Sequence, residues 1–172
     1  MHAVKLHELP PTAPPDELER KLASLGYPGF EHVRSTRKSD PAEVVLSAIL
    51  TRDLDTRLIE ALPWVLFTFP DLNWEWLRDG AKSKDAQNRL GYLVHLAAQM
   101  ARIAPKRRNA LAVLARWESD LEQARLAGEG TLCRDSMPAA ERNWLRKHRP
   151  PAAALWRVLT GLDAAQLPYA AR

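Results

Sequence analysis

The chain has 172 residues, of which 46% are hydrophobic and 27% are charged, and this composition is typical of one globular domain rather than of a disordered chain. The single cysteine, Cys133, excludes an intramolecular disulfide and a zinc site made of cysteines alone, and no apolar run approaches the roughly 20 residues of a membrane span. The net charge of +4 is modest. Because the proline-rich start also lacks the features of a secretory signal, we expect a cytoplasmic protein without a membrane partner.

The first part of the chain predicts an arm followed by short helices. Four prolines among the first 15 residues block a helix, so we expect residues 1–14 to form a flexible or extended arm. A helix is expected at 15–25 and a loop at 26–39. Asp40 then caps a second helix, because Pro41 follows it at the first helical position.

The next segment predicts the centre of the core. A third helix starts at Asp53 or Asp55 and leads into the stretch 62–69, which is almost wholly apolar and is therefore expected to be buried on several sides. Pro63 should kink this helix or restart it. A short helix follows and is expected to break or end at Gly80.

Two long helices are expected at 83–103 and 105–127. Apolar side chains recur at spacings of three and four in both segments, which is the pattern of an amphipathic helix. Because only a few residues separate the two helices, we expect an antiparallel helical hairpin at the centre of the fold.

The end of the chain predicts shorter elements. Glycines make 128–137 the best candidate for an exposed loop or hinge, and Ser136 is expected to cap a helix that runs to about residue 148. A last helix is expected at 151–160 with Leu155 facing inward, followed by a tail at 162–172.

The fold class predicted from these elements is all-α, a single helical domain of about seven to eight helices. Its organisation is an arm at 1–14, a main helical domain at 15–127, a loop at 128–137 and a basic helical portion at 138–172 that packs on the main domain.

Charge is distributed unevenly along the chain. Residues 1–100 carry 12 basic and 14 acidic side chains, whereas residues 101–172 carry 13 and 7. The basic residues gather in three clusters: Arg34, Arg37 and Lys38; Arg102, Lys106, Arg107 and Arg108; and Arg142, Arg146, Lys147 and Arg149. Solvated helix faces are the simpler interpretation, and nucleic-acid contact is the alternative. The nucleic-acid-binding candidates are Arg34, Arg37, Lys38, Arg107, Arg108, Arg146 and Lys147. The first cluster is the better candidate for phosphate, because the N-terminus of the helix capped by Asp40 adds partial positive charge beside it.

Motifs of cofactor and metal chemistry are absent from the sequence. It has no phosphate-binding glycine loop, no His-Glu-x-x-His and no Gly-x-Ser-x-Gly. Asp71, Glu75 and Asp79 would share a helix face, but capping and pairing with nearby lysines explain them better than a metal does. We therefore expect no cofactor and no metal. Trp144, which lies between two arginines, could stack on a base or anchor a partner protein.

Two Arg/His pairs resemble the ribonuclease signature of the HEPN family of helical bundles, in which histidine follows arginine by four to six residues. The pairs are Arg89 with His95, and Arg142 with His148. The second pair matches better, because the polar Asn143 follows the arginine. The resemblance implies that His148 is a general base on a ribose hydroxyl and that Arg142 stabilises the phosphate charge. A protein with 18 arginines is nevertheless expected to contain such a spacing by chance.

The segment 61–94 resembles the helical part of abortive-infection-type antitoxins. It contains Pro-Asp-Leu-Asn-Trp at 70–74 and Asn-Arg-Leu-Gly-Tyr-Leu at 88–93, where that family has a Pro-Asp-Leu-x-Trp turn before a helix with a similar motif. The resemblance implies a protein partner, a cognate nucleotidyltransferase toxin. It also implies a winged-helix DNA-binding domain at the N-terminus, but residues 1–60 predict two helices and no winged pair of strands.

Two classes of function therefore stay open. The first is a non-catalytic interaction module of a bacterial defence or toxin–antitoxin system, which binds a protein partner and has nucleic acid as a second expected ligand. The alternative is a small helical ribonuclease that uses Arg142 and His148.

Overall fold

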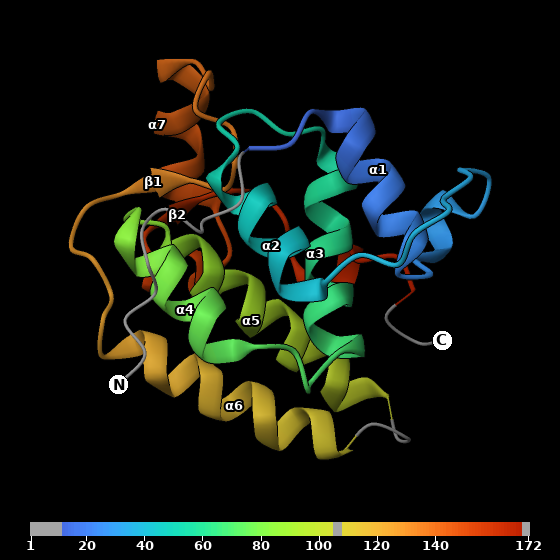
Figure 1. The fold of residues 1–172 in the computed structure, drawn as a ribbon. Coiled ribbons are helices and arrows are strands. Elements are labelled where there is room, and N and C mark those ends of the chain that lie inside the picture. Colours follow the sequence, from blue (N-terminus) through green and yellow to red (C-terminus); the bar gives the residue numbers. More distant parts are fainter. Residues whose placement is uncertain (1–11, 105–107, 170–172) are drawn as a thin grey trace.

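The computed structural model describes residues 12–104 and 108–169, and Figure 1 shows them as helices gathered around α3 and α5. The helices are α1 (Pro15–Ser24), α2 (Pro41–Leu50), α3 (Thr56–Thr68), α4 (Trp74–Ser83), α5 (Gln87–Ile103), α6 (Arg108–Glu122), α7 (Ala139–His148) and α8 (Pro151–Leu155). Two 3-10 turns, η2 (Pro28–Phe30) and η4 (Ala164–Gln166), and two short strands, β1 (Gly130–Thr131) and β2 (Val158–Leu159), complete the described elements. The expected all-α fold is confirmed. Residues 1–11 of the expected arm lie outside the described residues.

Local capping signals position the first helices. The Asp40 carboxylate accepts a hydrogen bond from the backbone N–H of Glu43 at 3.0 Å and starts α2, as predicted. Asp55 caps α3 in the same way, accepting from the N–H of Arg57 at 2.8 Å. Gly26, with a φ of +85°, ends α1 in the left-handed conformation that glycine adopts without strain.

Two expected helix breaks have different outcomes. α3 does not restart at Pro63, because Thr56–Thr68 is one helix with Pro63 inside it and with Leu62 and Val65 buried beside it. The alternative expectation, a kink at Pro63, stays a prediction. The expected break at Gly80 is wrong. Gly80 is buried inside α4, which packs against α2. After α4, Asp85 adopts the left-handed conformation, with a φ of +54°. The next helix, α5, then begins at Gln87 rather than at the expected residue 83.

The central antiparallel hairpin is confirmed and consists of α5 and α6. Asn88 near the start of α5 exchanges two hydrogen bonds with the backbone of Leu126, which follows α6. Further along α5, His95 contacts Glu118 of α6 at 2.7 Å. Moving forward along α5, from Asn88 to His95, the contacts move backward along the second segment, from Leu126 to Glu118. The two helices therefore run in opposite directions.

The segment 128–137 is an exposed loop only in part, because it also contains a short strand and a buried stretch. Its β1 pairs in parallel with β2, in the register Gly130 to Val158 and Thr131 to Leu159. Leu132 and Cys133 are at most 2% exposed. Strands of two residues have no alternating pattern long enough to be recognised in a sequence, which is why this pairing was missed.

Two expectations for the C-terminal portion, the Ser136 cap and the length of the last helix, are also corrected. Ser136 does not cap α7, because its N–H and hydroxyl both donate to Asp53, at 2.9 and 2.7 Å. The helix expected at 151–160 ends at Leu155, whose side chain is 51% exposed instead of facing inward. The tail packs on the body as far as it is described, since the Tyr92 hydroxyl donates to the Leu162 carbonyl and Leu167 is buried.

One hydrophobic core joins the described parts of the chain. It contains side chains from Ala13 to Leu167, including Trp156, which is completely buried. In the described ranges, no helix combines the length and apolar character that crossing a bilayer requires.

Candidate functional site

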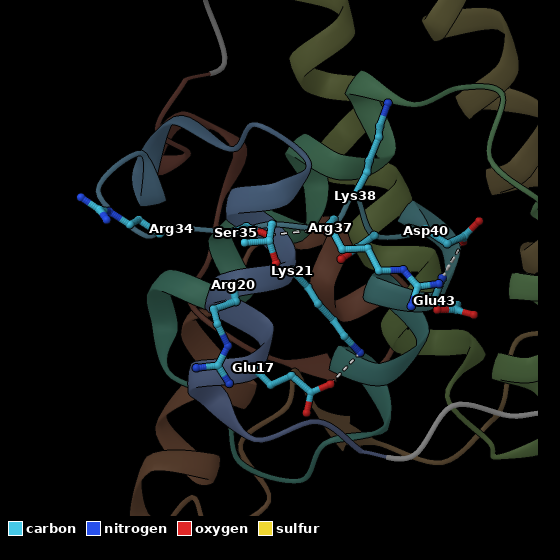
Figure 2. A pocket seen from close by; sticks show the side chains of 11 residues that line it. Glu17, Arg20, Lys21, Arg34, Ser35, Arg37, Lys38, Asp40 and Glu43 are labelled. Carbon is cyan, nitrogen blue, oxygen red and sulfur yellow. Dashed lines mark hydrogen bonds and ion pairs between the residues drawn. The ribbon is translucent and has the colours of Figure 1, made fainter.

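The first basic cluster lies on the rim of a hollow of about 580 Å³ between α1 and the segment that leads into α2, shown in Figure 2. The structure thus brings Arg34, Arg37 and Lys38 together with Arg20 and Lys21 of α1. Arg34 and Lys38 extend in different directions, and all three side chains of the cluster are exposed.

The charges around this hollow largely balance. Arg20 and Lys21 form ion pairs within α1, at 3.1 and 2.9 Å from their acidic partners. Asp40 and Glu43 also line the hollow and offset two charges of the basic cluster. The Asp40 carboxylate already occupies the N-terminus of α2, so the partial positive charge expected there is not available to a phosphate.

The other two basic clusters lie elsewhere on the molecule. Figure 1 places the segment before α2, the start of α6 and α7 at three separate corners of the fold. Lys106 and Arg107 lie outside the described residues, and Arg108 is the first residue of α6. On α7, Arg146 pairs with Glu129 at 2.8 Å, whereas Lys147 is exposed. The described parts of the clusters therefore do not form one continuous basic surface.

Arg142 and His148 both lie on α7, but no contact joins their side chains. The Arg142 guanidinium donates to the carbonyl oxygens of Met137 and Asp135, at 2.9 and 2.7 Å. The exposed His148 ring stacks on Trp144, with 4.3 Å between ring centroids and 14° between ring planes. Six residues separate the pair along a helix, which places the two side chains on different faces.

The other Arg/His pair is part of the internal structure. The Arg89 guanidinium donates to the carbonyl oxygens of Thr131 and Ile49, at 2.9 and 3.0 Å, and pairs with Asp135 at 2.8 Å. His95 pairs with Glu118 instead. This role of Arg89 was missed by the sequence analysis, because its partners are at least 40 residues away along the chain.

The three spaced carboxylates on and before α4 are not gathered at one point, and the described residues contain no group of three or more His, Cys, Asp or Glu side chains placed to hold a metal ion. Asn73 rather than Asp71 caps α4. Asp79 pairs with Arg78 at 2.8 Å, not with either of the lysines that follow it.

The face of α7 that points to solvent carries an exposed tryptophan. Leu145 is the only buried residue of this helix. Trp144 is 57% exposed, although the other described tryptophans are buried or partly buried. Trp144 and His148 form a stacked pair beside the exposed Lys147, and we call these three residues the α7 face.

Comparison with models of protein families, with curated proteins and with solved structures finds no match to this chain. The resemblance to abortive-infection-type antitoxins therefore rests on its short motif alone. In the structure that motif spans the turn before α4 and the first two turns of α5.

Proposed function

We propose that this protein is a non-catalytic interaction module of the antitoxin type, which binds a protein partner through the α7 face. The observation that carries the proposal is the exposure of the Trp144 and His148 stack on a helix with one buried residue. Interface hot spots are enriched in tryptophan, because a large ring that leaves water on binding contributes much of the affinity.

The local structure makes Trp144 a suitable anchor. The His148 ring covers one side of the indole, and Nδ1 of His148 is 2.8 Å from the Trp144 carbonyl oxygen. A side chain that is already held in place loses less conformational entropy when it binds. The adjacent Lys147 adds positive charge, which favours a partner with an acidic surface.

The positions of the polar side chains support a non-catalytic role. Arg142 and Arg89, the two arginines of the possible ribonuclease pairs, both donate to backbone carbonyl oxygens inside the fold. His95 is paired with Glu118. The side chains of Arg89, Arg142 and His95 are therefore already bonded within the protein and connect parts of the fold.

The experiment uses the full chain, purified with a tag from its source cells, together with a Trp144→Ala variant. The matched control is Ile103→Ala, because Ile103 is another large apolar side chain that is 61% exposed and lies on α5. We expect a stoichiometric protein partner with the wild type and the control, and at least a tenfold loss of that partner with Trp144→Ala.

A second step tests the antitoxin character. The recovered partner, expressed alone, should arrest growth, and co-expression with this chain should restore it, less effectively when the chain carries Trp144→Ala. Full restoration by Trp144→Ala would contradict the proposed face. Cleavage of RNA by the purified chain that disappears in His148→Ala would contradict the non-catalytic role.

A further inference from the structure

The helix α7 is attached to the body of the protein along one side. Leu145 is its only buried residue and packs with Met137 and Leu159 in a cluster that is separate from the main core. Seven of the ten residues of α7 are exposed, and Figure 1 shows the helix at one corner of the fold. Most of the circumference of this helix is therefore open to a partner.

An apolar stripe runs along α7 on a side that Leu145 does not occupy. Ala140, Trp144 and His148 follow one another at spacings of four, so their side chains lie one above another on the helix. We call these three exposed residues the outer stripe. The small Ala140 lets another chain approach closely, and the stacked rings of Trp144 and His148 supply a flat surface beside it. Anchors at this spacing are those of a helix that is held in a groove of another protein.

The charges of α7 have one sign on its exposed sides. Its one acidic residue, Glu141, is partly buried and pairs with Arg134 at 2.9 Å. The exposed charged residues of the helix are Arg146 and Lys147. Arg146 is bound to Glu129, so Lys147 is the charge that the helix offers next to the outer stripe. A partner that surrounds this side of α7 is complementary to it when the edge of its binding surface is acidic.

Polar contacts set the direction in which α7 presents the outer stripe. Glu129 binds Arg146 at 2.8 Å and Arg149 at 3.1 Å, at the C-terminal end of the helix. Nearer the other end, the Arg142 guanidinium donates to two carbonyl oxygens of the segment that precedes the helix. A helix that is already formed and oriented loses less conformational entropy when it binds.

We propose that α7 binds its protein partner by inserting into an apolar groove of that partner. The outer stripe lies on the floor of the groove, and Lys147 faces an acidic residue on its rim. The inference rests on the proposed function, because both use α7. It goes further in assigning the shape and the charge of the surface that the partner must have.

The first test uses the full chain and the partner purified with it, and measures their dissociation constant by biolayer interferometry. Ala140→Glu places a charge on the outer stripe and should weaken binding at least tenfold, because the carboxylate would be buried in an apolar groove. The matched control is Ala139→Glu, since Ala139 is also exposed but lies on a different side of the helix. It should bind within about twofold of the wild type. Circular dichroism should show the same helix content in both variants.

The second test examines the rim of the groove. Lys147→Glu should weaken binding at least fivefold at low ionic strength, and the loss should shrink at high ionic strength because salt screens the repulsion. The matched control is Lys84→Glu, at an exposed lysine directly after α4, which should bind like the wild type at both ionic strengths.

The outcomes separate this inference from the proposed function. If Trp144→Ala loses the partner while Ala140→Glu and Lys147→Glu bind like the wild type, the proposed function holds and the groove is overturned. Equal weakening by Ala139→Glu and Ala140→Glu would show that the outer stripe is not the inserted side. A dimer of this chain that depends on Trp144 in light scattering, or recovery of nucleic acid in place of a protein, would also overturn the proposal. Recovery of no partner at all would overturn the proposed function and this inference together.

Discussion

At the residue scale, Cys133 shows how burial controls chemistry in this fold. The thiol is completely buried and donates weakly to the Ala48 carbonyl oxygen at 3.7 Å. Burial raises the pKa of the Cys133 thiol to about 12; Arg89 opposes this shift and Asp135 adds to it. Because the thiolate is the reactive form, Cys133 is a structural side chain rather than a nucleophile.

We therefore predict that iodoacetamide at pH 8 leaves Cys133 unmodified in the native protein and alkylates it fully in guanidinium chloride. Mass spectrometry of the intact chain measures both. The neutral thiol stabilises the fold below the unfolded pKa of about 9, and this contribution is lost as the pH rises toward the folded pKa of about 12. The urea midpoint should accordingly fall between pH 9 and 12. Alkylation of the native protein at the rate of the unfolded chain would contradict this prediction.

Gly91 illustrates a close approach between elements. A Cβ atom added there would clash with the ring of Trp156, which is completely buried. We predict that Gly91→Ala lowers the free energy of unfolding by about 1–3 kcal/mol, as overpacking of a tight core does. Urea denaturation followed by circular dichroism measures the change.

Gly128→Ala is the matched control for Gly91→Ala, because nothing lies within 4 Å of a Cβ added at Gly128. It should change the free energy of unfolding by less than about 0.5 kcal/mol, the usual range for surface substitutions. Equal stabilities of the two alanine variants would show that Trp156 moves aside without cost.

At the element scale, Arg89 of α5 holds the segment 130–137 against the end of α2. It donates to Thr131 in that segment and to Ile49 of α2, and pairs with Asp135 at 2.8 Å. Arg52 also pairs with Asp135, at 3.5 Å, but its side chain is 85% exposed. The two arginines thus share one acidic partner in very different surroundings.

We predict that Arg89→Ala lowers the free energy of unfolding by about 2–3 kcal/mol, because two carbonyl oxygens and a partly buried carboxylate lose a charged donor. Arg52→Ala should cost less than about 1 kcal/mol, as exposed ion pairs do. Hydrogen exchange of the amides of 130–137 should accelerate in the first variant alone. Similar exchange in both variants would assign the stability of this segment to its strand pairing.

The elements that the sequence predicted correctly are those whose signals are local. Asp40 and the proline that follows it define the start of α2 regardless of what the helix packs against. The apolar spacing that predicts α5 and α6 is likewise visible within each helix segment alone. The parallel pair of β1 and β2 joins residues 28 positions apart and has two residues per strand, so no local pattern announces it. The expected break at Gly80 is wrong, because Gly80 is a buried residue inside α4, a helix that packs against α2.

The candidate sites divide in the same way. Trp144 was recognised from its two arginine neighbours, which a short window of sequence contains. The Arg142 and His148 pair has the required spacing, but the structure commits Arg142 to backbone carbonyl oxygens.

At the scale of the whole molecule, the main domain and the C-terminal portion share one core. Trp156 and Leu167 belong to the same cluster of buried side chains as residues of α1, α3 and α5. The Tyr92 hydroxyl on α5 also binds the Leu162 carbonyl oxygen. Separate unfolding of residues 138–172 would expose this shared surface, so it should not occur on its own.

We therefore predict a single cooperative transition, in which circular dichroism and tryptophan fluorescence report the same urea midpoint.

α7 is the expected local exception, because Leu145 is its one buried side chain and belongs to a small cluster with Met137 and Leu159 rather than to the main core. Its amides should exchange through local opening with a lower free energy than those of α5. Amide exchange in α7 as slow as in α5 would contradict this prediction and would show that contacts other than those of Leu145 hold the helix in place. If the two optical midpoints differed, the C-terminal portion would be a unit of its own, despite the core that it shares with α5.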